Sequence, residues 1–115
     1  MARQISRAVV VDALNAANRE FKWCFNIVSS MSRGQNNKNA GENIIRFQIR
    51  LFRAIEELEE VYRGITKEEK RLVNKKAALN TDWFPKRMAK LASYKEAVKE
   101  ALTIGRAIGD GFAWF

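Results

Sequence analysis

Apolar residues recur at helical spacing along much of this chain, and the segment from Glu42 to Arg63 carries the densest pattern. One stripe, at steps of three and four residues, consists of Ile44, Phe47, Leu51, Ile55, Leu58 and Tyr62, and a second stripe beside it consists of Ile45, Ile49 and Phe52. Laid out on a helix, the two stripes cover about two-thirds of the circumference. The segment is therefore predicted to be a central helix that other elements cover on at least two sides.

Two further long segments each carry a single apolar face. The face of residues 6–31 includes Val10, Leu14, Ala17, Phe21 and Val28, and the face of residues 84–108 includes Phe84, Met88, Leu91, Val98 and Ile108. Ser6 suits the N-cap position of the first segment. The steps of the second segment approach a heptad repeat, which favours lengthwise packing against the central helix. Gly105 and Gly109 would permit a close approach there, although residues 109–111 would equally serve as a helix stop.

Local signals between the central and last segments predict an additional, short helix. Gly64 suits the left-handed position at which helices end. Thr66 and Glu69 form a capping-box pattern, which starts a helix by satisfying free N–H groups of its first turn. The helices are therefore expected at about 6–31, 42–63, 67–79 and 84–108. The predicted fold class is all-α, a four-helix, largely antiparallel bundle with one short helix.

A chain of 115 residues suits a single helical domain, 1–115. Its last four residues include the aromatic side chains Phe112, Trp114 and Phe115. Three interpretations of these aromatics stay open: they fold back on the core, they dock into a partner, or the chain is the N-terminal part of a longer one. The apolar run Val9–Val11 is too short for a secretory segment or a membrane span, so we expect a cytoplasmic protein that does not enter a membrane.

The chain contains no histidine and one cysteine, Cys24. This excludes serine–histidine and cysteine–histidine catalysis, histidine-ligated zinc and an intrachain disulfide within the chain. Cys24 stands between two aromatic residues, which favours a buried structural thiol. The run Glu56–Glu60 is interpreted as a solvated charged face, because consecutive side chains point around a helix. We therefore predict no catalytic residue, no cofactor and no metal site, and expect that the protein is not an enzyme.

The charge balance favours a polyanionic partner. The chain has 21 basic and 13 acidic residues, a net charge of +8 and a pI near 10. Such an excess suits nucleic acid or an acidic protein surface. The candidate nucleic-acid-binding residues are Arg46, Arg50, Lys70, Arg71, Lys75, Lys76, Lys86, Arg87 and Lys90. The first hypothesis is thus a non-catalytic nucleic-acid-binding protein or subunit with little sequence selectivity, and a helix-turn-helix spanning the short helix and the last one is a more specific form of it.

A second hypothesis is a protein–protein interaction module, such as an inhibitor, an antitoxin-like partner or a self-assembling helical protein. Trp23 and Ile27 fall away from the apolar face of the first helix, so either a second layer or a dimer partner covers them, or they serve for docking or base stacking. The candidate partner-binding residues are Trp23, Ile27, Phe112, Trp114 and Phe115. A protein partner or a homo-oligomer is expected in this case.

Overall fold

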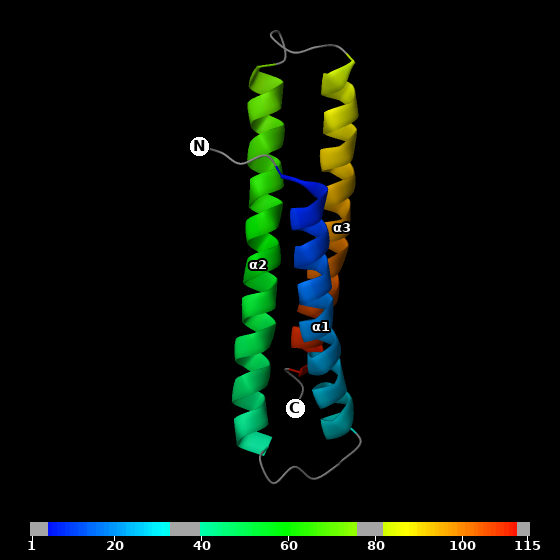
Figure 1. Cartoon of the computed structure of the whole chain (residues 1–115). Coiled ribbons are helices and arrows are strands. Elements are labelled where there is room, and N and C mark those ends of the chain that lie inside the picture. The colour runs from blue at the N-terminus through cyan, green and yellow to red at the C-terminus, as the bar shows by residue number, and fades with distance from the viewer. Residues whose placement is uncertain (1–4, 33–39, 76–81, 113–115) are drawn as a thin grey trace.

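The computed structural model describes the backbone of residues 5–32, 40–75 and 82–112, and the side chains of residues 5–27, 29, 45–75 and 82–110. Its elements are three helices, α1 (Arg7–Ser32), α2 (Ala40–Asn74) and α3 (Trp83–Phe112). They lie side by side, with α2 antiparallel to both α1 and α3, as Figure 1 shows. The molecule is a rod of 62 × 23 × 22 Å. The all-α class is confirmed for the described residues, which contain no strand.

The prediction of four helices is wrong, because α2 runs without a break for 35 residues through the expected helix end. Thr66 does not cap a new helix: its hydroxyl donates a hydrogen bond of 3.0 Å to the carbonyl oxygen of Tyr62, one turn earlier in the same helix. Glu69, the other half of the predicted capping box, forms an ion pair of 3.1 Å with Lys95 of α3. Gly64 lies inside α2, and a Cβ atom there would stand 3.1 Å from the Ile5 side chain. Its missing side chain makes room for a neighbour instead of ending the helix.

The reason for the continuous helix is a heptad seam that does not stop at Gly64. The core positions of α2 alternate in steps of four and three residues and comprise Phe47, Leu51, Ala54, Leu58, Val61, Ile65, Glu68 and Leu72. A cap contributes about 1 kcal/mol, whereas fully burying one large apolar side chain contributes about 1.5–3 kcal/mol. Burial of Ile65 and Leu72 in the seam therefore outweighs the local stop and start signals. Residues 67–74 of the expected short helix 67–79 are the last part of α2, and residues 76–79 lie outside the described chain.

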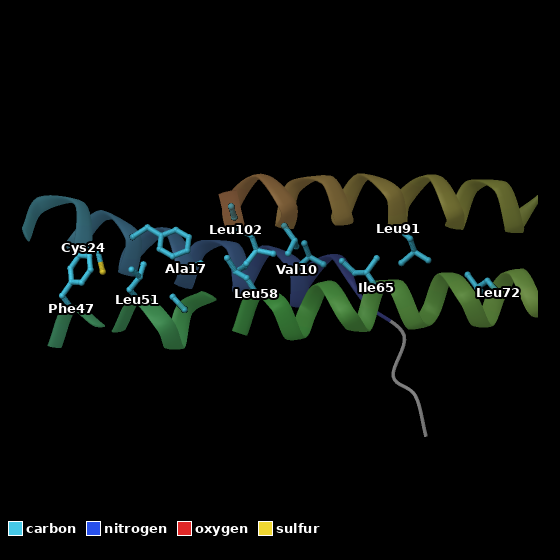
Figure 2. Close-up of a cluster of buried hydrophobic side chains, with 14 residues drawn as sticks. Val10, Ala17, Cys24, Phe47, Leu51, Leu58, Ile65, Leu72, Leu91 and Leu102 are labelled. Atoms are coloured by element: carbon cyan, nitrogen blue, oxygen red, sulfur yellow. The ribbon is translucent and has the colours of Figure 1, made fainter. Parts of the chain in front are cut away.

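The three helices share one core (Figure 2). From α1 it takes Val10, Ala17, Phe21 and Cys24, and from α3 it takes Leu91, Val98, Ala101 and Leu102. These residues stand opposite the heptad seam of α2, so the predicted lengthwise packing against a central helix is confirmed. The second stripe of the central helix is not covered as expected. Ile45, Ile49 and Phe52 are 60%, 52% and 62% exposed.

The helices are staggered along the rod, so that all three pack together only in its middle. Ile5, just before α1, contacts the region of Gly64 and Glu68, and beyond that level α2 and α3 continue as a pair (Figure 1). At the other end, Gly109 of α3 is level with Leu51, and α1 and α2 continue beyond it as a pair. We call the α2–α3 extension the α2/α3 end of the rod.

Gly105 allows α3 to approach its neighbours closely, as its position in the sequence suggested, and α3 continues through Gly109 instead of stopping there. A Cβ atom on Gly105 would lie 2.5 Å from Cζ of Phe21 and 3.2 Å from Cγ1 of Ile55. Phe21 is itself buried, so its ring has little room to move. The glycine is therefore required by the packing of α3 against both other helices.

Replacing Gly105 with alanine is expected to lower the free energy of unfolding by about 1–3 kcal/mol through overpacking, despite a gain of about 1 kcal/mol in helix propensity. Gly109→Ala is the matched control, because its Cβ would meet only the Cδ2 atom of Leu51, at 3.3 Å. This control should be neutral or stabilising by up to about 1 kcal/mol. Urea denaturation followed by circular dichroism at 222 nm measures both. Equal effects at the two positions would contradict the close contact at Gly105.

Candidate nucleic-acid interface

Most of the net positive charge belongs to one stretch of the chain, around the α2/α3 end. Residues 66–95 hold nine basic and three acidic side chains, a net charge of +6 out of the total of +8. This stretch comprises the last turns of α2 and the first half of α3. Because these two segments are antiparallel neighbours (Figure 1), charges that are far apart along the chain come together at one end of the rod.

Two of the three acidic side chains in this stretch form ion pairs between α2 and α3. The side chain of Glu68 is only 3% exposed, and its Oε2 atom accepts hydrogen bonds from Nε and Nη2 of Arg87, at 3.1 and 2.8 Å. Its Oε1 atom accepts a hydrogen bond of 2.9 Å from the backbone N–H of Ile5, and Nη2 of Arg87 also donates to the Ile5 carbonyl oxygen at 2.5 Å. We call this arrangement the Glu68–Arg87 node. It joins α2, α3 and the start of the chain.

Glu69 pairs with Lys95 on the other side of the same two helices, at 3.1 Å. The hydrogen bond that Lys95 donates to Glu69 raises the pKa of Lys95, whose Nζ atom also lies 5.4 Å from the centre of the Tyr62 ring. Two of the three acidic groups that would otherwise offset the lysines of this end are thus engaged between the helices, and the carboxylate of Glu68 is withdrawn from the surface.

The node also shows which basic residues share a side of the α2–α3 pair. Arg71 lies 3.8 Å from Glu68, so Arg71 and Arg87 approach one carboxylate from two helices. Residues three or four positions away from each arginine lie on the same helix face. Among them are Lys67 on α2, Lys75 directly after the end of α2, and Trp83 and Lys90 on α3. All four of these side chains are exposed.

A shallow hollow of about 280 Å³ lies on this side and is lined by Trp83, Lys86, Arg87 and Lys90. We define the basic face as the side-chain set Lys67, Arg71, Lys75, Trp83, Lys86, Arg87 and Lys90. Apart from the tryptophan ring, every exposed member is a cation. A surface of this kind suits an extended row of phosphate groups, which bind lysine and arginine donors.

Only some of the residues predicted to bind nucleic acid lie on the basic face. Arg71, Lys75, Lys86, Arg87 and Lys90 belong to the basic face, although Arg87 is only 14% exposed and already bonded to Glu68. Lys70 is exposed on α2, but one residue before Arg71 it points about 100° away around the helix. Lys76 lies outside the described residues.

The remaining two predicted arginines, Arg46 and Arg50, lie in the other half of the rod. Nε of Arg50 donates a hydrogen bond of 2.6 Å to Glu20, and this bond raises the pKa of the guanidinium. The same guanidinium lies 4.0 Å from the centre of the Trp23 ring. Arg50 therefore joins α1 to α2 and is not displayed with the lysines of the basic face.

Of the residues predicted to bind a partner, the structure describes the side chains of two, Trp23 and Ile27. Trp23 and Ile27 are half-buried and pack against the core, and Arg50 covers one face of the Trp23 ring. The side chains of Phe112, Trp114 and Phe115 lie outside the described residues. The apolar residues exposed in this half of the rod are different ones, the second stripe of α2 together with Phe25 and Ile104.

Sequence reasoning missed Lys67, Trp83 and the Glu68–Arg87 node. The signal for Glu68 was present, because it continues the steps of four and three from Val61 and Ile65 at a heptad core position. The predicted helix break at Gly64 concealed it. Trp83 stands four residues before Arg87 in a helix, which would have placed both on one face.

The described part of the chain shows neither an accessible thiol nor a metal-binding cluster. Cys24 is fully buried, and burial raises its pKa to about 11, so the thiol stays protonated at neutral pH. This confirms the prediction of a buried structural cysteine. Among the described residues no group of three or more acidic or cysteine side chains could hold a metal ion. None of the three helices, as far as they are described, is long and apolar enough to cross a membrane.

Comparison with known proteins finds no matching family model, no matching curated protein and no matching solved structure.

Proposed function

We propose that this protein is a non-catalytic nucleic-acid-binding protein that grips phosphates through the basic face, with little sequence selectivity. The observation that carries the proposal is the arrangement of charge at the α2/α3 end. Glu68 and Glu69 are engaged in ion pairs between the helices, while Lys67, Lys75 and Lys90 are exposed on one side. The positive field of this end is therefore directed outward, where it attracts phosphates and releases their counterions.

Weak selectivity follows from the shape of the basic face. The helix-turn-helix considered for this region required a separate short helix, and residues 67–74 are instead the end of the long helix α2. Two antiparallel helices lying side by side do not project one recognition helix into a groove. Contacts from such a surface go to the sugar–phosphate backbone, which carries no direct sequence information.

Removing the exposed lysines is expected to weaken binding and reduce its salt dependence. In the variant Lys67→Gln/Lys75→Gln/Lys90→Gln, affinity for a fluorescein-labelled oligonucleotide at about 0.1 M salt should fall at least about tenfold. The slope of log K against log salt should become shallower by roughly 2–3, since each lost phosphate contact contributes about 0.7–0.9. Fluorescence anisotropy over a range of salt concentrations measures both quantities.

The matched control is Arg19→Gln/Lys22→Gln/Lys99→Gln, which removes the same three charges from exposed positions away from the basic face. Its salt slope should equal that of the wild type. Two results would overturn the proposal: no binding by the wild type at low salt, or an equal loss of affinity and slope in both variants. The second result would mean that only net charge matters.

Self-association is a second candidate function, favoured by the apolar surface away from the basic face. A groove of about 560 Å³ between α1 and α3 is lined mainly by apolar side chains, among them Phe21, Phe25 and Ile104. Phe25 and Ile104 are 60% and 53% exposed, and the second stripe of α2 is exposed as well. Exposed apolar surface of this kind marks contact sites. Contact between two copies through these residues would make the stability of the fold depend on protein concentration.

A further inference from the structure

The exposed tryptophan of the basic face is not explained by phosphate binding alone. Trp83 is 40% exposed, although the neighbouring residues Phe84 and Met88 pack against the core. A large aromatic ring that leaves this much surface in water contributes less to stability than a buried one. Phosphate contacts require cations and hydrogen-bond donors, and an indole ring adds little to them.

The surroundings of Trp83 fit one particular use of the ring. Lys86, Arg87 and Lys90 follow it by three, four and seven residues on α3, and all four side chains line one hollow of about 280 Å³. Lys86 and Lys90 are about one helical turn apart, or about 5 to 6 Å along the axis. A partly exposed aromatic ring thus lies beside two exposed lysine side chains within about two turns of one helix.

We propose that the basic face binds single-stranded nucleic acid, with an unpaired base stacked on Trp83 and the neighbouring phosphates bound by Lys86 and Lys90. This inference rests on the proposed function and names its substrate class. Proteins that bind single strands without sequence preference combine a positively charged surface with aromatic rings on which bases stack. The bases of a duplex are stacked on each other, so a ring on a flat helical surface reaches them only in a single strand.

The same contacts predict how a duplex would bind to this surface. Its phosphates would meet the lysines, but the Trp83 ring would find no base to stack against. Single strands should therefore bind more tightly than duplexes of equal length once salt weakens the phosphate contacts. The difference between the two ligands should depend on Trp83 and not on the lysines.

The test compares a fluorescein-labelled 20-nucleotide oligo-dT strand with a 20-base-pair duplex, by anisotropy at fixed salt. Trp83→Leu, which keeps an apolar side chain but removes the ring, should weaken single-strand binding about five- to 150-fold, the range expected for losing one stacked base. Trp83→Phe, which keeps a ring, should weaken it less than about fivefold. Duplex affinity should change less than about twofold in either variant. Circular dichroism checks that both variants keep the helical fold.

A second readout is the fluorescence of Trp83 itself, measured in the variant Trp23→Phe/Trp114→Phe, where Trp83 is the remaining tryptophan. Stacking of a base should quench this emission on addition of oligo-dT and leave it unchanged on addition of the duplex. If oligo-dT binds without quenching, and Trp83→Leu binds it like the wild type, the stacking role is overturned while the proposed function stands. Absence of binding to both ligands would overturn the proposed function as well.

Two further outcomes would also overturn the inference. Equal losses of single-strand and duplex affinity in Trp83→Leu would mean that the ring only positions the lysines. Binding of polyglutamate with the same dependence on Trp83 would identify the ligand as an acidic protein segment.

Discussion

Replacing Glu68 with leucine is expected to lower the free energy of unfolding by about 3–5 kcal/mol, because it leaves a buried arginine without its counter-charge. The side chain of Arg87 is only 14% exposed. Its Nε and Nη2 groups donate hydrogen bonds to the Glu68 carboxylate, and Nη2 also donates to the Ile5 carbonyl oxygen. The variant also leaves the N–H group of Ile5 without the acceptor it has in the native fold. A loss of this size is a large share of the stability of a small domain, which is typically about 5–15 kcal/mol.

The double variant Glu68→Leu/Arg87→Met should recover most of this loss, since apolar replacement of a whole buried pair is often neutral or stabilising. Urea denaturation at constant salt, followed by circular dichroism, measures the single and double variants. Glu69→Gln is the matched control: it removes the neighbouring acid, whose partner Lys95 is 33% exposed, and should cost at most about 1 kcal/mol. If the single variant at Glu68 costs no more than this control, the node does not hold α2, α3 and Ile5 together.

Phe47→Ala should lower the free energy of unfolding by about 3–5 kcal/mol, the usual cost of removing a buried phenylalanine. Phe47 is 1% exposed and stands in the heptad seam of α2. The matched control is Phe52→Ala, five residues further along the same helix, at a side chain that is 62% exposed. This substitution should change stability by no more than about 0.5 kcal/mol in the monomer. Urea denaturation of both variants at equal protein concentration measures the two free energies of unfolding.

The Phe52→Ala control also tests the second candidate function, self-association. If two copies of the chain cover the second stripe of α2, Phe52→Ala will be costly at high protein concentration and harmless at low concentration, because association stabilises the fold by mass action. A cost near that of Phe47→Ala at every concentration would mean that Phe52 is buried within one chain, contrary to its exposure in the structure.

The candidate interface could be foreseen from the sequence only in part. The excess of charge after Thr66 is visible in the sequence, and five of the nine predicted nucleic-acid-binding residues lie on the basic face. The direction of each charge was not visible, because it depends on which side of α2 meets α3. Arg50 illustrates this: its ion pair with Glu20 and its contact with Trp23 join residues about 30 positions apart.

The sequence by itself determined the helical class, the central position of the segment around Phe47 to Leu58 and the buried state of Cys24, because these depend on apolar residues repeating at the period of a helix. Only the tertiary structure decided the number of helices and the place of the site. Gly64 and Thr66 carry signals for a helix end that is worth about 1 kcal/mol locally, and burial of Ile65 and Leu72 and the pairing of Glu68 with Arg87 outweigh them. The heptad steps of α2 mark Ile65, Glu68 and Leu72 as core positions, but the groups that pair with Glu68 come from α3 and from Ile5, and these partners are not visible in the sequence of α2.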